Sequence, residues 1–378
     1  MRLSAKERFL DAIGSALAGR GIARGDVDSV EFQTGRNFSA HVTLLNGEKL
    51  YAKQLRGADC EQRLLRTVRF NSWFAESTPG FSSPSLLGHD YDSRTVIYEY
   101  VPSSQKLEEE ISTSRVEMST LQEVAKVLAE FHGASIDNHD DFDKSLPNYP
   151  PAGMAAIPMG YFENATMGEL DLWRLVQGDG DLQQSLHSLV TEDSPRTLIH
   201  GDFRSDQVLL HGDGISLIDW EEFRLGDPAR DLGGFLGEIF YHGIRSLATG
   251  ATSDGSQLTE EGILDRGAEL LEEIRPRIQT CWHTYLSCRM EMAAVSSTSE
   301  VGAEVTASSQ DKVEFGLDSS LSSRTLGFMG WHMFDRSLVS TSVAGRLSAH
   351  DRALSGIGRN MILHRDEFIA TLGLERMP

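Results

Sequence analysis

The chain has 378 residues, of which 40% are hydrophobic, so it can bury a large core in one two-lobed unit or in two domains. Its 56 acidic and 35 basic residues give a formal net charge of −21, which disfavours nucleic acid as a substrate because phosphate backbones are bound through Lys and Arg. The three cysteines show neither a metal-ligand spacing nor a disulfide framework, the N-terminus is amphipathic and charged, and no apolar run reaches about 18 residues, so we expect a cytoplasmic protein without membrane spans.

The first predicted elements are two strands, 41–45 and 49–55. They are joined by Asn46-Gly47, which is a strong signal for a β-hairpin. Lys53 lies in the second strand, between Ala52 and Gln54. A strand lysine by itself is usually only a solvated one, so its importance depends on motifs further along the chain.

The middle of the chain begins with segment 95–102, a β-branched and aromatic run closed by proline, which predicts a strand. Residues 124–132 carry apolar residues at helical spacing and predict a core helix. The C-terminal third is mostly helical in pattern. Helices are predicted over 259–292, with a break or kink at Arg275-Pro276, over 325–347 and over 351–372. Residues 296–323 are rich in Ser, Thr and acid, a composition that buries little, so we expect a mobile loop there.

Segment 198–232 carries the most chemical information. It reads LIHGDFRSDQVLL, then HGDG at 211–214, then ISLIDWEEFRLGDPARDL, so that two apolar runs flank a turn and predict a second β-hairpin. Folding this hairpin is expected to bring Asp202, Gln207 and Asp219 to one end of it.

These three residue types suit phosphoryl transfer from a magnesium–nucleotide complex. One carboxylate accepts the proton of the acceptor hydroxyl, while a second carboxylate and an amide oxygen hold metal ions on the phosphates. The alternative is that Asp202 and Asp219 are solvated turn residues, which is the commoner fate of an Asp beside Gly. The occurrence of HGD, IDWE and GDPxxD in this order argues against that alternative.

With these motifs the chain resembles the aminoglycoside phosphotransferase and choline kinase-like superfamily, whose fold is related to that of protein kinases. The resemblance implies that Asp202 is the catalytic base, Asp219 the main magnesium ligand and Asp231 a buried brace for the catalytic loop. Gln207 stands where the family pattern has Asn. Its amide oxygen, one methylene further out, can still ligate a metal.

The resemblance also implies an α+β, bilobal, protein-kinase-like fold. Residues 1–101 would form a small N-lobe, an antiparallel sheet plus a helix that covers the nucleotide. Residues 102–378 would form a larger, mainly helical C-lobe, with the catalytic hairpin at 198–232, acceptor-binding insertions and a helical tail.

ATP and Mg²⁺ are the cofactors that the resemblance implies. Lys53 would pair with the α and β phosphates, with Glu61 on the following helix as its partner and Glu76 as the alternative. The polar loop 34–39, which contains Gly35, would lie over the phosphates with its backbone N–H groups. The adenine would meet the backbone of a hinge segment at Glu99, Tyr100 and Val101.

The implied activity is an ATP-dependent O-phosphotransferase that moves the γ-phosphate to a hydroxyl of an amine-bearing natural product or antibiotic-like small molecule. A cationic acceptor would suit the acidic runs at 107–110 and 137–143. Solubility explains these runs equally well, so the acceptor class stays open at this point.

Two alternative functions also stay open. Segment 352–358 and the long helical tail are similar to the kinase subunits of class V lanthipeptide or thioamitide dehydratases, which would make the chain a peptide Ser/Thr kinase that needs a lyase partner. A non-catalytic nucleotide-binding scaffold would keep Lys53 and Asp219 but would be indifferent to Asp202. The presence of all three residues argues against the scaffold.

Overall fold

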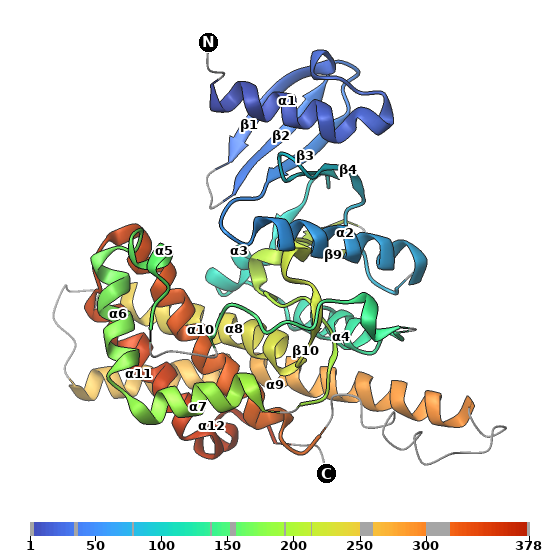
Figure 1. The fold of residues 1–378 in the computed structure, drawn as a ribbon. Coiled ribbons are helices and arrows are strands. Elements are labelled where there is room, and N and C mark those ends of the chain that lie inside the picture. The colour runs from blue at the N-terminus through green and yellow to red at the C-terminus, as the bar shows by residue number, and fades with distance from the viewer. Residues whose placement is uncertain are drawn as a thin grey trace. The chain divides into compact units, whose positions relative to one another are not determined.

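The structure is a computed structural model, and it describes residues 4–33, 37–77, 79–136, 138–151, 156–192, 194–212, 214–249, 260–299 and 318–375. It divides into two units (Figure 1). The sheet unit comprises residues 1–106, 138–143 and 207–224, and the helical unit comprises residues 107–137, 144–206 and 225–378. Residues 102–106, 138–143 and 207–224, which the predicted lobe boundaries assign to the C-lobe, are therefore grouped with the sheet.

The sheet unit is built on an antiparallel sheet. Its strands are β1 (Val27–Gln33), β2 (Phe38–Leu44), β3 (Lys49–Gln54), β4 (Leu86–Asp90) and β5 (Thr95–Glu99). They lie in the order β1-β2-β3-β5-β4. The turn between β2 and β3 contains Asn46-Gly47, and Gly47 adopts a φ of 87°, a left-handed conformation that glycine reaches at little cost. The predicted hairpin is confirmed.

The two faces of this sheet are covered by different helices, because successive strand residues point to opposite faces. The helices are α1 (Ala5–Leu17) and α2 (Cys60–Ser77). Phe9 of α1 belongs to one buried cluster with Ala52, whereas Leu64 of α2 belongs to another with Val96. Lys53 follows Ala52 in β3 and lies opposite Val96 in β5, so its side chain belongs to the α2 face.

A smaller sheet carries the second predicted hairpin. Its strands are β6 (Gln105–Lys106), β8 (Val208–His211) and β9 (Gly214–Leu217), in the order β6-β8-β9. The pairing of β8 with β9 is antiparallel, so this hairpin is confirmed as well. One turn of 3-10 helix, η5 (Trp220–Glu222), follows β9.

The helical unit contains most of the helices. They are α3 (Leu107–Ser112), α4 (Met118–His132), α5 (Met159–Phe162), α6 (Met167–Gln177), α7 (Gly180–Thr191), α8 (Ala229–Thr249), α9 (Glu260–Ser299), α10 (Leu321–Ala344), α11 (Ala349–Leu363) and α12 (Arg365–Leu372). Helix α4 packs on α9, and α10 packs on α8 and α11. Helices α10 and α11 approach closely, because a Cβ added at Gly358 of α11 would lie 2.5 Å from the carbonyl oxygen of Gly330 of α10. Gly358, in the segment 352–358, thus has a packing role.

The helical predictions need two corrections. Helix α9 continues through Pro276, so the helix does not break there, and the alternative of a kink stays a prediction. The predicted loop 296–323 is helical at both ends, since α9 extends to Ser299 and α10 begins at Leu321. Residues 300–317 lie outside the described residues.

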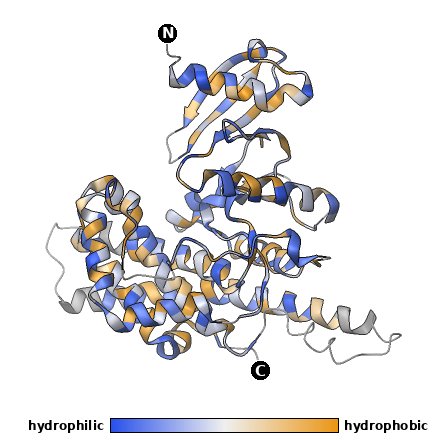
Figure 2. Cartoon of the chain, in the orientation of Figure 1, coloured by the Kyte–Doolittle hydropathy of each residue, from blue (hydrophilic) through white to orange (hydrophobic). Residues whose placement is uncertain are grey.

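The predicted fold class is confirmed: an antiparallel sheet with its helices in the smaller unit and a larger, mainly helical unit. Figure 2 shows hydrophilic residues interspersed along the helices. Among the described residues, no helix is long and apolar enough to cross a membrane.

Candidate active site

The hairpin β8–β9 places Gln207 and Asp219 at the same end, as predicted. Gln207 immediately precedes β8, and its carbonyl accepts a hydrogen bond from the Ile218 N–H at 3.0 Å. Asp219 comes next and adopts a left-handed backbone with φ 71°, a conformation that Asp tolerates better than most residues. Both residues belong to the sheet unit, whereas Asp202 belongs to the helical unit, so its expected place at this end of the hairpin stays a prediction.

An aromatic cluster holds the turn that carries Asp219. Trp220 is 1% exposed and stacks on Phe70 of α2, with ring centroids 3.7 Å apart. Phe223 packs edge-on against the same Phe70 ring. The Trp220 indole N–H donates to the Ser83 hydroxyl at 3.1 Å. Anchoring of Trp220 fixes the residues on either side of it, Asp219 and Glu221.

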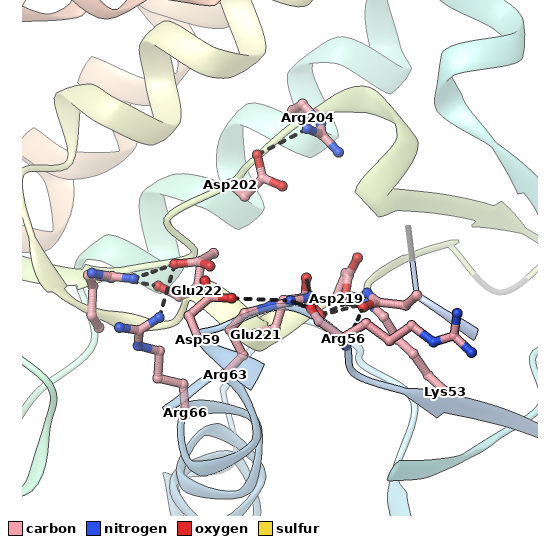
Figure 3. A network of polar contacts seen from close by, with 12 residues as sticks. Lys53, Arg56, Asp59, Arg63, Arg66, Asp202, Arg204, Asp219, Glu221 and Glu222 are labelled. Carbon is pink, nitrogen blue, oxygen red and sulfur yellow. Dashed lines mark hydrogen bonds and ion pairs between the residues drawn. The ribbon is translucent and has the colours of Figure 1, made fainter. Parts of the chain in front are cut away.

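Lys53 reaches this turn from β3 (Figure 3). Its ammonium group forms an ion pair with Asp219 and a second with Glu221 at 2.8 Å, and its side chain is only 9% exposed. Burial disfavours the charged ammonium, but the attraction of the two carboxylates outweighs it and raises the pKa of Lys53 above its ordinary value. A permanently charged lysine is therefore held beside the predicted magnesium ligand.

The expected partner of Lys53 needs correction. Glu61 lies in the first turn of α2 and is exposed, and Glu76 near the other end of α2 is exposed too. Neither forms the ion pair, because the carboxylates that contact Lys53 are Asp219 and Glu221. Sequence reasoning missed Glu221, although it is the last residue of the IDWE motif.

The α2 residue that faces this site is Arg63, which is 0% exposed and forms an ion pair with Glu221. Sequence reasoning missed Arg63 as well. Arg63 is one of three arginines in α2, and the sequence does not distinguish it from the others, because its burial depends on packing against the turn that carries Glu221.

The other predicted nucleotide-binding residues have local contacts in the sheet unit. The Glu99 carboxylate accepts a hydrogen bond from the Ser85 hydroxyl at 3.2 Å, and the Tyr100 ring lies 5.2 Å from the His41 ring. The Val101 carbonyl accepts from Ser104 at 3.0 Å. Their contact with adenine stays a prediction, and Gly35 lies outside the described residues.

In the helical unit, Asp231 braces the loop that carries Asp202. The loop follows β7 (Thr197–Ile199), which pairs with β10 (Arg224–Gly226). The fully buried Asp231 carboxylate accepts backbone N–H bonds from His200 at 2.6 Å and Gly201 at 2.9 Å, and it contacts His132 at 3.2 Å. Burial disfavours the carboxylate, but the bonds from His132 and the backbone outweigh it and lower the pKa of Asp231. The predicted buried brace is confirmed.

Asp202 itself is paired with Arg204 at 3.2 Å (Figure 3), and its side chain remains 42% exposed. Poor hydration beneath the surrounding protein atoms raises the pKa of Asp202 to about 7. Arg204 opposes this rise, while Asp335 and Asp206 add to it. A carboxylate with a pKa near 7 has the proton affinity that suits a general base at neutral pH.

The donor set of the sheet unit suits magnesium bound together with phosphates. Among the described residues, no cluster of three or more His, Cys, Asp or Glu could hold a metal ion. Mg²⁺ commonly takes one or two protein carboxylates and completes its octahedron with water and phosphate oxygens. Asp219 and the amide oxygen of Gln207 fit that pattern.

A family model described as the phosphotransferase enzyme family matches residues 31–268. A choline kinase structure from Cryptosporidium parvum Iowa II is 13% identical with a TM-score of 0.53, and the match covers 98% of this chain and 97% of that chain. A Plasmodium vivax ethanolamine kinase structure is 14% identical with a TM-score of 0.51, and the match covers 90% of this chain and 85% of that chain. At these identities the likeness concerns the fold.

No curated protein sequence is significantly similar to the chain. The family model nevertheless covers more than half of it, and the superfamily expected from the motifs is confirmed. The chain belongs to the phosphotransferase enzyme family.

Proposed function

We propose that the protein is an ATP-dependent kinase that transfers the γ-phosphate to a hydroxyl of an amine-bearing small molecule. The observation that carries this proposal is the contact of Lys53 with Asp219, two residues 166 positions apart in the sequence. A buried lysine beside a carboxylate is the pair needed to bind nucleotide phosphates and their metal ion.

The roles of the residues follow from their chemistry. Lys53 binds phosphate oxygens, and Asp219 with Gln207 holds Mg²⁺, which neutralises phosphate charge when it is bound. Asp202 accepts the proton of the acceptor hydroxyl as the new O–P bond forms and ADP leaves. The intact braced loop around Asp202 supports catalysis over a nucleotide-binding scaffold, since a scaffold needs no base.

The proposal of an amine-bearing acceptor rests on the negative charge of the protein. The side chains of Glu108, Glu109 and Glu110 lie in the first turn of α3, and the whole chain has a net charge of −21. A negative surface of this kind favours a cationic partner. The two similar structures are named as choline and ethanolamine kinases, so these amino alcohols head the panel of acceptors to be tested.

The first test measures binding of nucleotide by calorimetry. Wild-type protein should bind ATP with Mg²⁺, and Asp219→Ala should lose the part of the affinity that depends on the metal because its main carboxylate is gone. Unchanged magnesium dependence in Asp219→Ala would remove Asp219 from the metal site.

The second test follows labelled γ-phosphate from ATP to choline, ethanolamine, an aminoglycoside and a Ser/Thr-containing peptide. Transfer to an amine-bearing alcohol supports the proposal. Transfer to the peptide alone would favour the precursor-peptide alternative with its lyase partner, and ATP binding without transfer to any acceptor would favour the scaffold.

A further inference from the structure

Glu221 joins two buried cations in the sheet unit. One carboxylate oxygen lies 2.8 Å from the Lys53 ammonium, and the other accepts a hydrogen bond from the Arg63 guanidinium (Figure 3). The side chains are 9% exposed for Lys53, 15% for Glu221 and 0% for Arg63. Charges removed from water to this extent depend on their partners for stability.

Arg63 is held from several directions. Its guanidinium donates to the Arg56 carbonyl at 2.8 Å and to the Asn37 side-chain oxygen at 3.2 Å, and it lies 3.6 Å from Asp59. Asn37 also accepts the Arg56 N–H at 3.1 Å. The guanidinium therefore connects α2 to the loop after β3 and to the start of β2. These contacts hold it in place independently of Glu221.

The two carboxylates that contact Lys53 differ in their other partners. Asp219 is the residue proposed to hold the metal ion, whereas Glu221 is already fixed by Arg63. Glu221 can thus keep Lys53 in place when Asp219 serves the metal. Helix α2 therefore acts on Lys53 indirectly, because its Arg63 binds Glu221 and Glu221 binds Lys53. It does not act through a glutamate of its own.

We propose that Arg63 is a positioning residue for nucleotide binding: it fixes Glu221, and Glu221 holds the Lys53 ammonium where the nucleotide phosphates bind. This inference rests on the proposed function. It assigns to the Arg63–Glu221 pair the task for which Glu61 was expected.

The test uses a matched pair of substitutions on one helix. Arg63→Met removes the proposed positioning residue, and Arg66→Met is the control. Arg66 is three residues further along α2, its side chain is 10% exposed, and it forms ion pairs with Asp143 at 2.6 Å and with Glu222 at 3.1 Å. Both substitutions remove a buried cation from α2. Each of these cations forms an ion pair with a carboxylate of η5.

Calorimetry with ATP, in EDTA and with Mg²⁺, gives the first readout. Arg63→Met should weaken ATP binding about 10- to 100-fold in both conditions because a displaced lysine misplaces its charge. Arg66→Met should stay close to wild type. The loss in Asp219→Ala should appear only with Mg²⁺, so the two defects are distinguishable. Equal ATP affinity of Arg63→Met and Arg66→Met would overturn the inference.

Double substitution gives the second readout. Glu221→Gln should weaken ATP binding as Arg63→Met does, and the double variant should be no weaker than either single variant, because both remove the same chain of contacts. Additive losses would overturn the inference. If Arg63→Met does not fold, as judged by its thermal unfolding, Glu221→Gln and Arg63→Lys carry the test, with Arg63→Lys expected between wild type and Glu221→Gln.

The outcome also separates this inference from the proposed function. Wild-type protein that does not bind ATP would contradict the proposed function itself. Wild-type binding that Glu221→Gln leaves unchanged would overturn only the role of the Arg63–Glu221 pair.

Discussion

At the scale of single residues, Asp202 combines an accessible side chain with a raised pKa. Its side chain is 42% exposed, yet its pKa is raised to about 7. Arg204 contacts Asp202 at 3.2 Å and Asp206 at 3.0 Å, so it shares its charge between two carboxylates and does not fully neutralise either.

Asp202→Asn is expected to lower kcat for phosphate transfer by about 10²–10⁴-fold, because a general base typically contributes that factor. ATP affinity should change little. The matched control is Asp206→Asn, which removes the other carboxylate paired with Arg204. Transfer assays and calorimetry on both variants measure this, and a wild-type rate in Asp202→Asn would show that Asp202 is not the base.

The pH dependence of transfer follows from the same group. A base works only when deprotonated, so a pKa of about 7 means that kcat/KM should fall as the pH is lowered through 7. Asp335→Asn removes a charge that raises this pKa, so its acid limb should shift to lower pH. A pH–rate profile for both proteins tests the assignment, and an acid limb that does not move in Asp335→Asn would contradict it.

At the scale of elements, helix α8 organises the loop that carries Asp202. Asp231 in its first turn accepts the N–H groups of His200 and Gly201, and Arg230 beside it donates to the Gly201 carbonyl at 2.7 Å. The start of one helix thus fixes the backbone immediately before the proposed base.

Asp231→Ala should lower the free energy of unfolding by about 2–6 kcal/mol, because two buried N–H groups lose their acceptor at about 1–3 kcal/mol each. Asp231→Asn, which keeps one acceptor oxygen, should lose less. Denaturant unfolding measures both variants. Loss of less than about 1 kcal/mol in Asp231→Ala would contradict the brace.

The sign of the pH effect provides a second check on Asp231. Its pKa is lowered in the folded state, so its stabilising contribution is present above the unfolded-state value of about 3.9 and is lost as the pH falls below it. The stability difference between wild type and Asp231→Asn should therefore shrink in acid.

At the scale of the whole molecule, net charge is the property most relevant to the acceptor. Neutralising Glu108, Glu109 and Glu110 together to Gln should raise the KM of a cationic acceptor and leave the KM of ATP unchanged. Added salt should also raise the KM of the cationic acceptor in wild type, because exposed charges are screened over about 8 Å at physiological ionic strength. Steady-state kinetics over a range of salt concentrations measures both.

The control for this triple change is Asp366→Asn with Glu367→Gln, which removes acidic residues from the first turn of another helix, α12. It should leave both KM values unchanged. Equal responses of the two variants, or no response to salt, would indicate that the charge of −21 serves solubility and would remove the argument for a cationic acceptor.

The sequence by itself determined the two hairpins and the proposed chemical groups. Asn46-Gly47 between alternating strands and HGDG between apolar runs specify local turns, and local hydrogen bonding is enough to form them. The motif spacing also placed Gln207 and Asp219 at one hairpin end, because both lie within a few residues of the paired strands.

Only the tertiary structure decided which carboxylate holds Lys53 and which face of α2 is buried. Glu61 and Arg63 are two residues apart on one helix, so helical periodicity points them in different directions, and packing of Phe70 against Trp220 selects the face that is buried. That face carries Arg63, which requires an acidic partner from outside the helix. Glu221 provides it, through a contact across 158 residues of sequence that no local pattern specifies.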